Sequence, residues 1–178
     1  LAQEEELRIA REVQEQLFPA GPPELAGYDI AGASRPAAAT GGDYFDFIPA
    51  PRGHLLLVVG DVTGHGLGPA MLMADARAYF RALVLSSGNF EDILVRARHL
   101  LIEDLGDEHF ITLLFVELEP TTGVLKYINA GHPAGYVLAP DGRIKAELTA
   151  NTAALGIDRS GAPLVAGPTI GAMSQFKL

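Results

Sequence analysis

The sequence predicts an α+β fold in which helices cover layered antiparallel sheets. Short apolar segments rich in β-branched residues follow one another with Gly, Pro and Asp between them, which is the pattern of consecutive β-hairpins. Two longer segments in the middle of the chain show the apolar spacing of helices. Because hairpins form antiparallel sheets whose apolar faces must be buried, we expect the two central helices to cover a sheet.

The chain begins with a charged segment of helical pattern at residues 3–17. Ile9, Val13 and Leu17 share one face of this helix, with Glu and Arg between them. Phe18-Pro19 ends it, because proline cannot continue a helix. Two interpretations stay open. The helix packs on the domain, or it is the end of a signalling helix from a preceding domain and also a homodimer contact.

The remaining elements follow in a simple order. Strands are expected at 28–34, 43–48 and 55–60, helices at 67–86 and 90–105, and strands at 110–118, 124–130, 136–138 and 144–148. Asn89 is placed to cap the second central helix, and Asp141-Gly142 is a common hairpin turn. The tail after Gly156 is rich in Gly, Ala and Pro and supports no prediction.

The size of the chain fits one domain. Its 178 residues are enough to bury an ordinary core. We expect an N-terminal helix at 1–20, which the second interpretation makes the end of a signalling linker, and a globular domain at 21–178.

Composition excludes several classes of protein. A net charge of −9 argues against a nucleic-acid-binding protein, which needs a basic surface. No apolar run approaches the length of a membrane span, so we expect no direct membrane insertion. The absence of cysteine excludes a disulfide framework, a thiolate zinc site and a cysteine nucleophile. These features are compatible with a cytoplasmic protein, which is the location we expect.

Two glycine–aspartate motifs flank the apolar segment at 55–59. The first is Gly41-Gly42-Asp43-Tyr44-Phe45-Asp46, and the second is Gly60-Asp61-Val62-Thr63-Gly64-His65-Gly66. An aspartate in a glycine-rich turn is often only a turn residue. Two such turns beside one strand can instead converge on a hard cation, because Mg²⁺ and Mn²⁺ prefer oxygen ligands.

With Asn129-Ala130-Gly131-His132-Pro133, these motifs occur in the order and at about the spacing of one family. The chain resembles the bacterial metal-dependent serine/threonine phosphatases of the SpoIIE/RsbU type, relatives of protein phosphatase 2C, from about residue 12 to 157. The resemblance implies a four-layer α-β-β-α sandwich with antiparallel sheets.

The same resemblance implies a site for two Mn²⁺ or Mg²⁺ ions. Asp61 matches the aspartate that bridges both ions, the Val62 carbonyl completes one site, and Asp43 matches a ligand of the second ion. Asp46 also fits the motif. His65 and His132 are motif residues, each a structural hydrogen-bonding group or a proton donor, and neither is assigned as the general acid.

The function implied by the resemblance is hydrolysis of phosphoserine or phosphothreonine by a metal-activated water, which needs no covalent intermediate. The substrate would be a phosphorylated regulatory protein of the anti-anti-sigma-factor type. The alternative is a non-catalytic regulatory module of the same fold that binds a partner protein.

One part of the family pattern has no match in this sequence. The family follows the segment that matches Leu155-Gly156-Ile157 with a strand, a Thr-Asp-Gly turn and a late aspartate, which supply further metal ligands. None of these occurs before Leu178. The sequence therefore predicts a domain that is incomplete at its C-terminus, with weak metal binding and with slow or no turnover.

Overall fold

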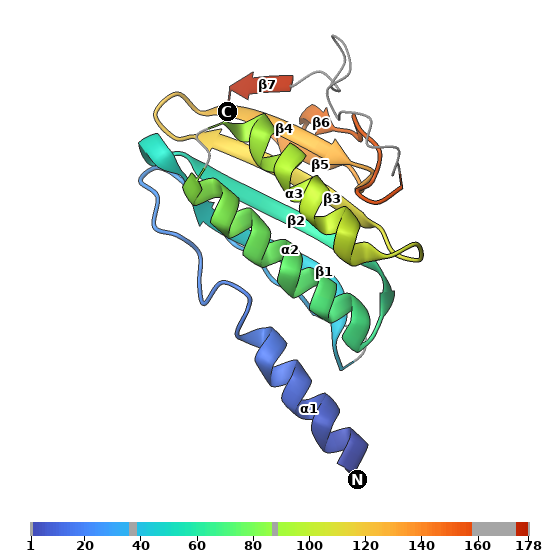
Figure 1. Cartoon of the computed structure of the whole chain (residues 1–178). Helices are drawn as coiled ribbons and strands as arrows, with labels where there is room; N and C mark the ends of the chain where they lie inside the picture. The colour runs from blue at the N-terminus through green and yellow to red at the C-terminus, as the bar shows by residue number, and fades with distance from the viewer. Residues whose placement is uncertain (1, 36–38, 87–88, 158–173, 178) are drawn as a thin grey trace.

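The computed structural model describes residues 2–35, 39–86, 89–157 and 174–177, and its centre is a five-stranded antiparallel sheet (Figure 1). The strands are β1 (Gly41–Pro49), β2 (Leu55–His65), β3 (Ile111–Glu119), β4 (Val124–Ala130) and β7 (Ser174–Lys177), and they lie in this order. A short 3₁₀ turn, η1 (Pro51–Gly53), joins β1 to β2. β1–β2 and β3–β4 are hairpins, whereas the two helices that follow β2 separate it from its partner β3.

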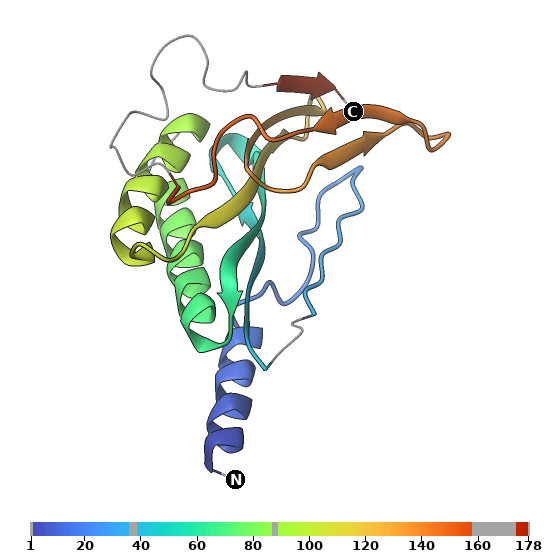
Figure 2. The same ribbon diagram turned by 90° about the vertical axis from the view of Figure 1, so that its right-hand side faces the viewer.

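Two helices, α2 (Leu67–Ser86) and α3 (Phe90–Leu105), cover one face of this sheet (Figure 2). Asn89 caps α3, because its side chain accepts a hydrogen bond from the Glu91 backbone N–H at 3.0 Å. Phe115 of β3 is fully buried beneath the helices, with its ring stacked on Phe90 and tilted against Phe80. Alternate residues of the strands supply the sheet side of this core.

The other face of the sheet packs against a hairpin and an extended segment. The hairpin consists of β5 (Gly135–Leu138) and β6 (Ile144–Leu148), and its Val137 and Leu148 join Leu55, Val116 and Leu125 in a second apolar cluster. The segment at 25–30 packs against the same cluster.

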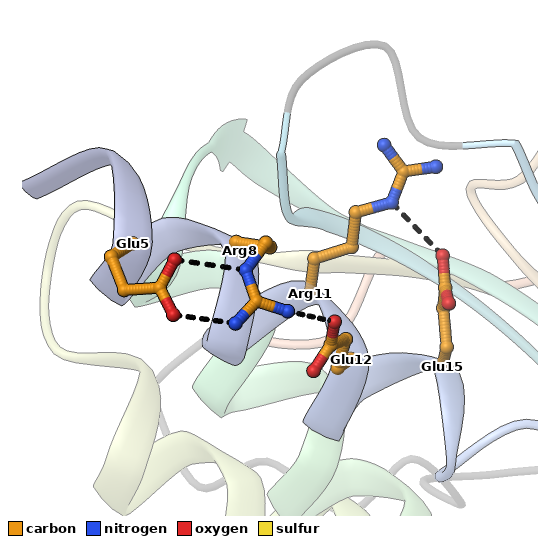
Figure 3. A network of polar contacts seen from close by, with 5 residues as sticks. All are labelled: Glu5, Arg8, Arg11, Glu12 and Glu15. Carbon is orange, nitrogen blue, oxygen red and sulfur yellow. Dashed lines mark hydrogen bonds and ion pairs between the residues drawn. The ribbon is translucent and has the colours of Figure 1, made fainter. Parts of the chain in front are cut away.

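The first helix, α1 (Ala2–Glu15), projects away from the sheet and the two central helices (Figure 1). Its surface carries ion pairs of Arg8 with Glu5 and Glu12, and of Arg11 with Glu15 (Figure 3). Exposed pairs of this kind contribute little to stability. Its C-terminal end is fastened by Gln14, which is buried and bonds both backbone groups of Gly41.

The predicted mixed α/β class with antiparallel sheets is confirmed, and both central helices have the expected bounds. The described residues form three of the four expected layers: helices, main sheet and hairpin. None of the described helices is long and apolar enough to cross a bilayer.

Two expectations about strands are wrong. Residues 28–34 form no strand, because the segment at 24–35 makes only the isolated bridge between Leu25 and Tyr28. The strand expected to end at residue 60 continues to His65, because β3 pairs with it as far as Val62 and Gly41 pairs with His65. In addition, β7 covers the outer edge of β4, where no partner was predicted.

Replacing Phe115 with alanine should destabilise the domain by about 3–5 kcal/mol, because the change empties a site enclosed by two aromatic rings. Urea unfolding followed by circular dichroism measures this loss. Leu85→Ala is the matched control, since Leu85 of α2 is 84% exposed and its removal should cost no more than about 0.5 kcal/mol. Equal losses in both variants would contradict the assignment of the core.

Candidate metal site

Asp43 and Asp61 face each other across the β1–β2 pair. The two residues are direct cross-strand partners, so their side chains leave the same face of the sheet. Both are exposed, whereas their neighbours Tyr44 and Val62 are buried on the helix side. The carboxylates therefore lie on the face opposite the helices, within paired strands rather than in the turns expected from their glycines.

Gly42 lets the two strands approach closely at this point. The pairing register shifts between Gly41 and Asp43, which marks an irregularity at the start of β1. A Cβ atom added to Gly42 would overlap the Val62 carbonyl oxygen and would also touch the Val62 side chain. Only glycine fits at position 42, and the Val62 backbone therefore lies directly against it, next to Asp43.

Asp43, Asp61 and Thr112 of β3 form a row of polar residues across three neighbouring strands. Thr112 is the cross-strand partner of Asp61, and its Oγ1 lies 2.8 Å from Nδ1 of His132. Asn129 fixes the loop that carries this histidine, because its Oδ1 accepts a hydrogen bond from the His132 backbone N–H at 2.8 Å. Asn129 is itself fully buried and donates to the Leu148 carbonyl.

The electrostatics of this row favour a bound cation. Asp61 is exposed overall, but partial burial of its carboxyl raises its pKa above the ordinary value, and the negative charge of Asp43 raises it further, against the influence of His132. Burial lowers the pKa of His132, although the two carboxylates oppose this shift. His132 is thus neutral near pH 7, and a cation between the carboxylates would relieve their repulsion.

A pocket of about 260 Å³ opens at this row. It is lined by Asp43 and Gly60 of the sheet, by His132, and by residues 33–35 of the extended segment. His65, the last residue of β2, is exposed and is not among the residues that line the pocket. Of the two motif histidines, the structure brings His132 to the carboxylates.

Asp46 lies on the opposite face of the sheet and is fully buried. Both of its oxygens accept hydrogen bonds from Arg81 of α2, at 2.6 and 2.7 Å, and Tyr44 donates a third at 3.0 Å. A buried carboxylate needs such partners. Because Asp46 points away from Asp43 and Asp61, the expectation that it shares their ion does not fit this geometry.

Sequence reasoning missed four residues that organise the site or its surroundings. These are Gln14, Arg81, Thr112 and, as a loop-fixing residue, Asn129. Asn129 stood within a recognised motif, but nothing local marked the other three, because each acts on a residue at least 20 positions away.

The donor set fits a hard cation. Two exposed carboxylates face each other, and neither forms an ion pair with Lys or Arg within the described ranges. Oxygen donors of this kind suit Mg²⁺ or Mn²⁺. No group of three or more His, Asp or Glu side chains suited to a metal occurs in the described part of the chain, so the protein ligands are few.

Comparison with known proteins assigns the family. The family model of Stage II sporulation protein E (SpoIIE) matches residues 51–167, about two thirds of the chain, including Asp61, Val62 and His132. The chain belongs to the SpoIIE family. Phosphoserine phosphatase RsbU of Bacillus subtilis is 24% identical over 154 residues, which cover 86% of this chain and 46% of RsbU.

Solved structures agree with this assignment. The RsbU and RsbW domains of Rv1364c from Mycobacterium tuberculosis match with 27% identity and a TM-score of 0.59, over 68% of this chain and 34% of that one. The SiaA-PP2C domain of Pseudomonas aeruginosa matches with 16% identity and a TM-score of 0.64, over 88% and 64% respectively, and shows a shared fold. The chain spans less than half the length of the curated relatives it matches.

Gly42→Ala should disrupt the site, because the new methyl group overlaps the Val62 carbonyl and pushes β1 away from β2. We expect a loss of about 1–3 kcal/mol in stability and weaker Mn²⁺ binding, measured by thermal unfolding and titration calorimetry. Gly21→Ala is the control, since nothing lies within 4 Å of a Cβ there. Normal Mn²⁺ affinity in Gly42→Ala would show that the close approach is dispensable.

Proposed function

We propose that this SpoIIE-family domain hydrolyses phosphoserine or phosphothreonine on a regulatory protein, with Mn²⁺ or Mg²⁺ as cofactor. The observation that carries the proposal is the facing pair of exposed carboxylates, Asp43 and Asp61, which have no Arg or Lys partner among the described residues. Asp43 of this pair lines the pocket. The family assignment and the similarity to RsbU support a serine phosphatase of the protein phosphatase 2C kind.

In this proposal the carboxylates of Asp61 and Asp43 would be the side-chain ligands of the cations, and the Val62 carbonyl would be a backbone ligand. When bound, the cations would lower the pKa of a shared water and neutralise phosphoryl oxygens. Neutral His132, held by Thr112, gives the pocket a hydrogen-bonding group rather than a positive charge.

The proposed substrate is a phosphorylated regulator of the anti-anti-sigma-factor type. The similarity to RsbU and to a structure that contains RsbU and RsbW domains supports this proposal. The alternative is a non-catalytic module of the same fold that binds such a partner. It is favoured by one observation, the small number of carboxylates that the described residues offer a metal.

Asp61→Asn should abolish Mn²⁺-dependent turnover of a phosphoserine peptide and weaken Mn²⁺ binding at least tenfold, because an amide carries no bridging charge. The metal-free variant should melt at the wild-type temperature or slightly above it, since the exchange removes repulsion from Asp43. Phosphate release and titration calorimetry provide the two readouts.

Asp92→Asn is the control, an exposed aspartate in the first turn of α3. It should leave both readouts unchanged. Wild-type turnover in Asp61→Asn would refute the site. Mn²⁺ binding without turnover in the wild-type protein would fit both the non-catalytic alternative and the slow or absent turnover expected from the sequence, and Mn²⁺ binding by Asp61→Asn would then test the site.

We also propose that α1 is the end of a signalling linker, that residues 21–178 form the phosphatase-like domain, and that α1 is a homodimer contact. Ile9 and Val13 of its apolar stripe are about half exposed. Together with Leu67 and Met71 they leave apolar surface open around α1 and the start of α2.

Val13→Glu should therefore shift a dimer towards monomer without unfolding the domain, because Val13 is 54% exposed. Light scattering after gel filtration and a thermal melt measure the two effects. Leu17→Glu is the contrasting variant and should destabilise the protein, since Leu17 packs against the main core. If the wild-type protein is monomeric at all concentrations tested, the dimer proposal is wrong.

A further inference from the structure

The segment at 28–35 is attached at two points, to the turn that follows β3 and to the sheet face opposite the helices. The Tyr28 hydroxyl donates a hydrogen bond to the Pro120 carbonyl at 3.1 Å. Four residues later, Gly32 lies against the rings of Phe45 and Phe47, where an added Cβ would come within 2.6 and 2.9 Å of ring carbons. These anchors direct the end of the segment towards the β1 residues that precede Phe45.

Arg35 lies at that end and lines the same pocket as Asp43 and His132. It is the one Lys or Arg among the described residues around this pocket. Its side chain is exposed and forms no ion pair with a carboxylate in the described part of the chain. A cationic group that stays unpaired beside an acidic site is available to an anionic ligand.

The charges of the pocket indicate what that ligand is. In the proposed function the two carboxylates are engaged by cations, so they do not compete for Arg35. A phosphoserine carries close to two negative charges at neutral pH. A guanidinium matches the phosphoryl oxygens with two parallel N–H donors, whereas Nδ1 of His132 is already hydrogen-bonded to Thr112.

We propose that Arg35 binds the phosphoryl group of the substrate and sets the affinity of the pocket for phosphomonoester dianions. The inference rests on the proposed phosphatase function and names a substrate-binding residue for it. Arg35 contacts the phosphate from the extended segment, whereas the side chains that would hold the cations lie on the sheet. It needs no role in metal binding.

The test uses the Mn²⁺-loaded protein with inorganic phosphate as the probe and a phosphoserine peptide as substrate. Arg35→Ala should weaken phosphate binding and raise KM for the peptide, each roughly tenfold or more, with Mn²⁺ affinity unchanged. Arg35→Lys should recover part of the loss, because it restores the charge without the paired donors.

Arg96→Ala is the matched control, an exposed arginine of α3 on the other side of the sheet, and should behave as wild type. Wild-type phosphate affinity and KM in Arg35→Ala would overturn the inference and leave the phosphatase function intact. Absence of Mn²⁺ binding in the wild-type protein would overturn the proposed function, and this inference with it. If the wild-type protein binds Mn²⁺ but has no turnover, the phosphate titration alone decides the role of Arg35.

Discussion

The structure depends on the close pairing of β1 and β2 at Gly42. That contact sets Asp43 opposite Asp61 and holds the Val62 backbone beside them. Partial burial raises the pKa of Asp61, and repulsion between the two carboxylates in this position raises it further. The pair persists because Tyr44 and Val62, the adjacent residues of the same strands, are buried beneath the helices and stabilise the pairing.

The aspartates on the two faces of the sheet differ in whether their charge is paired. On the helix face, Asp46 is fully buried and its charge is balanced by a two-point hydrogen bond from Arg81. On the face opposite the helices, Asp43 and Asp61 have no Arg or Lys partner among the described residues. A buried charge must be paired, whereas an exposed one need not be. Only the face opposite the helices therefore leaves carboxylates available to a metal ion.

Sequence patterns predicted the central helices and the candidate aspartates, because both signals are local. The glycines were misinterpreted. Gly42 and Gly60 indicated turns, whereas in the structure they allow neighbouring strands to approach, and Asp61 lies inside β2. Thr112 and Gln14 could not be predicted, because their roles depend on strand register and on where α1 meets the sheet.

Gln14 gives the first helix a direct connection to this site. Its amide donates to the Gly41 carbonyl at 2.6 Å and accepts from the Gly41 N–H at 3.1 Å, and Gly41 is followed by Gly42 and Asp43. Buried hydrogen bonds of this kind contribute about 1 kcal/mol each, and leaving their partners unsatisfied costs more. A displacement of α1 must therefore either break both bonds or move the start of β1. In either case the change reaches the start of β1 beside Gly42, a point where β1 and β2 have no room for a larger residue.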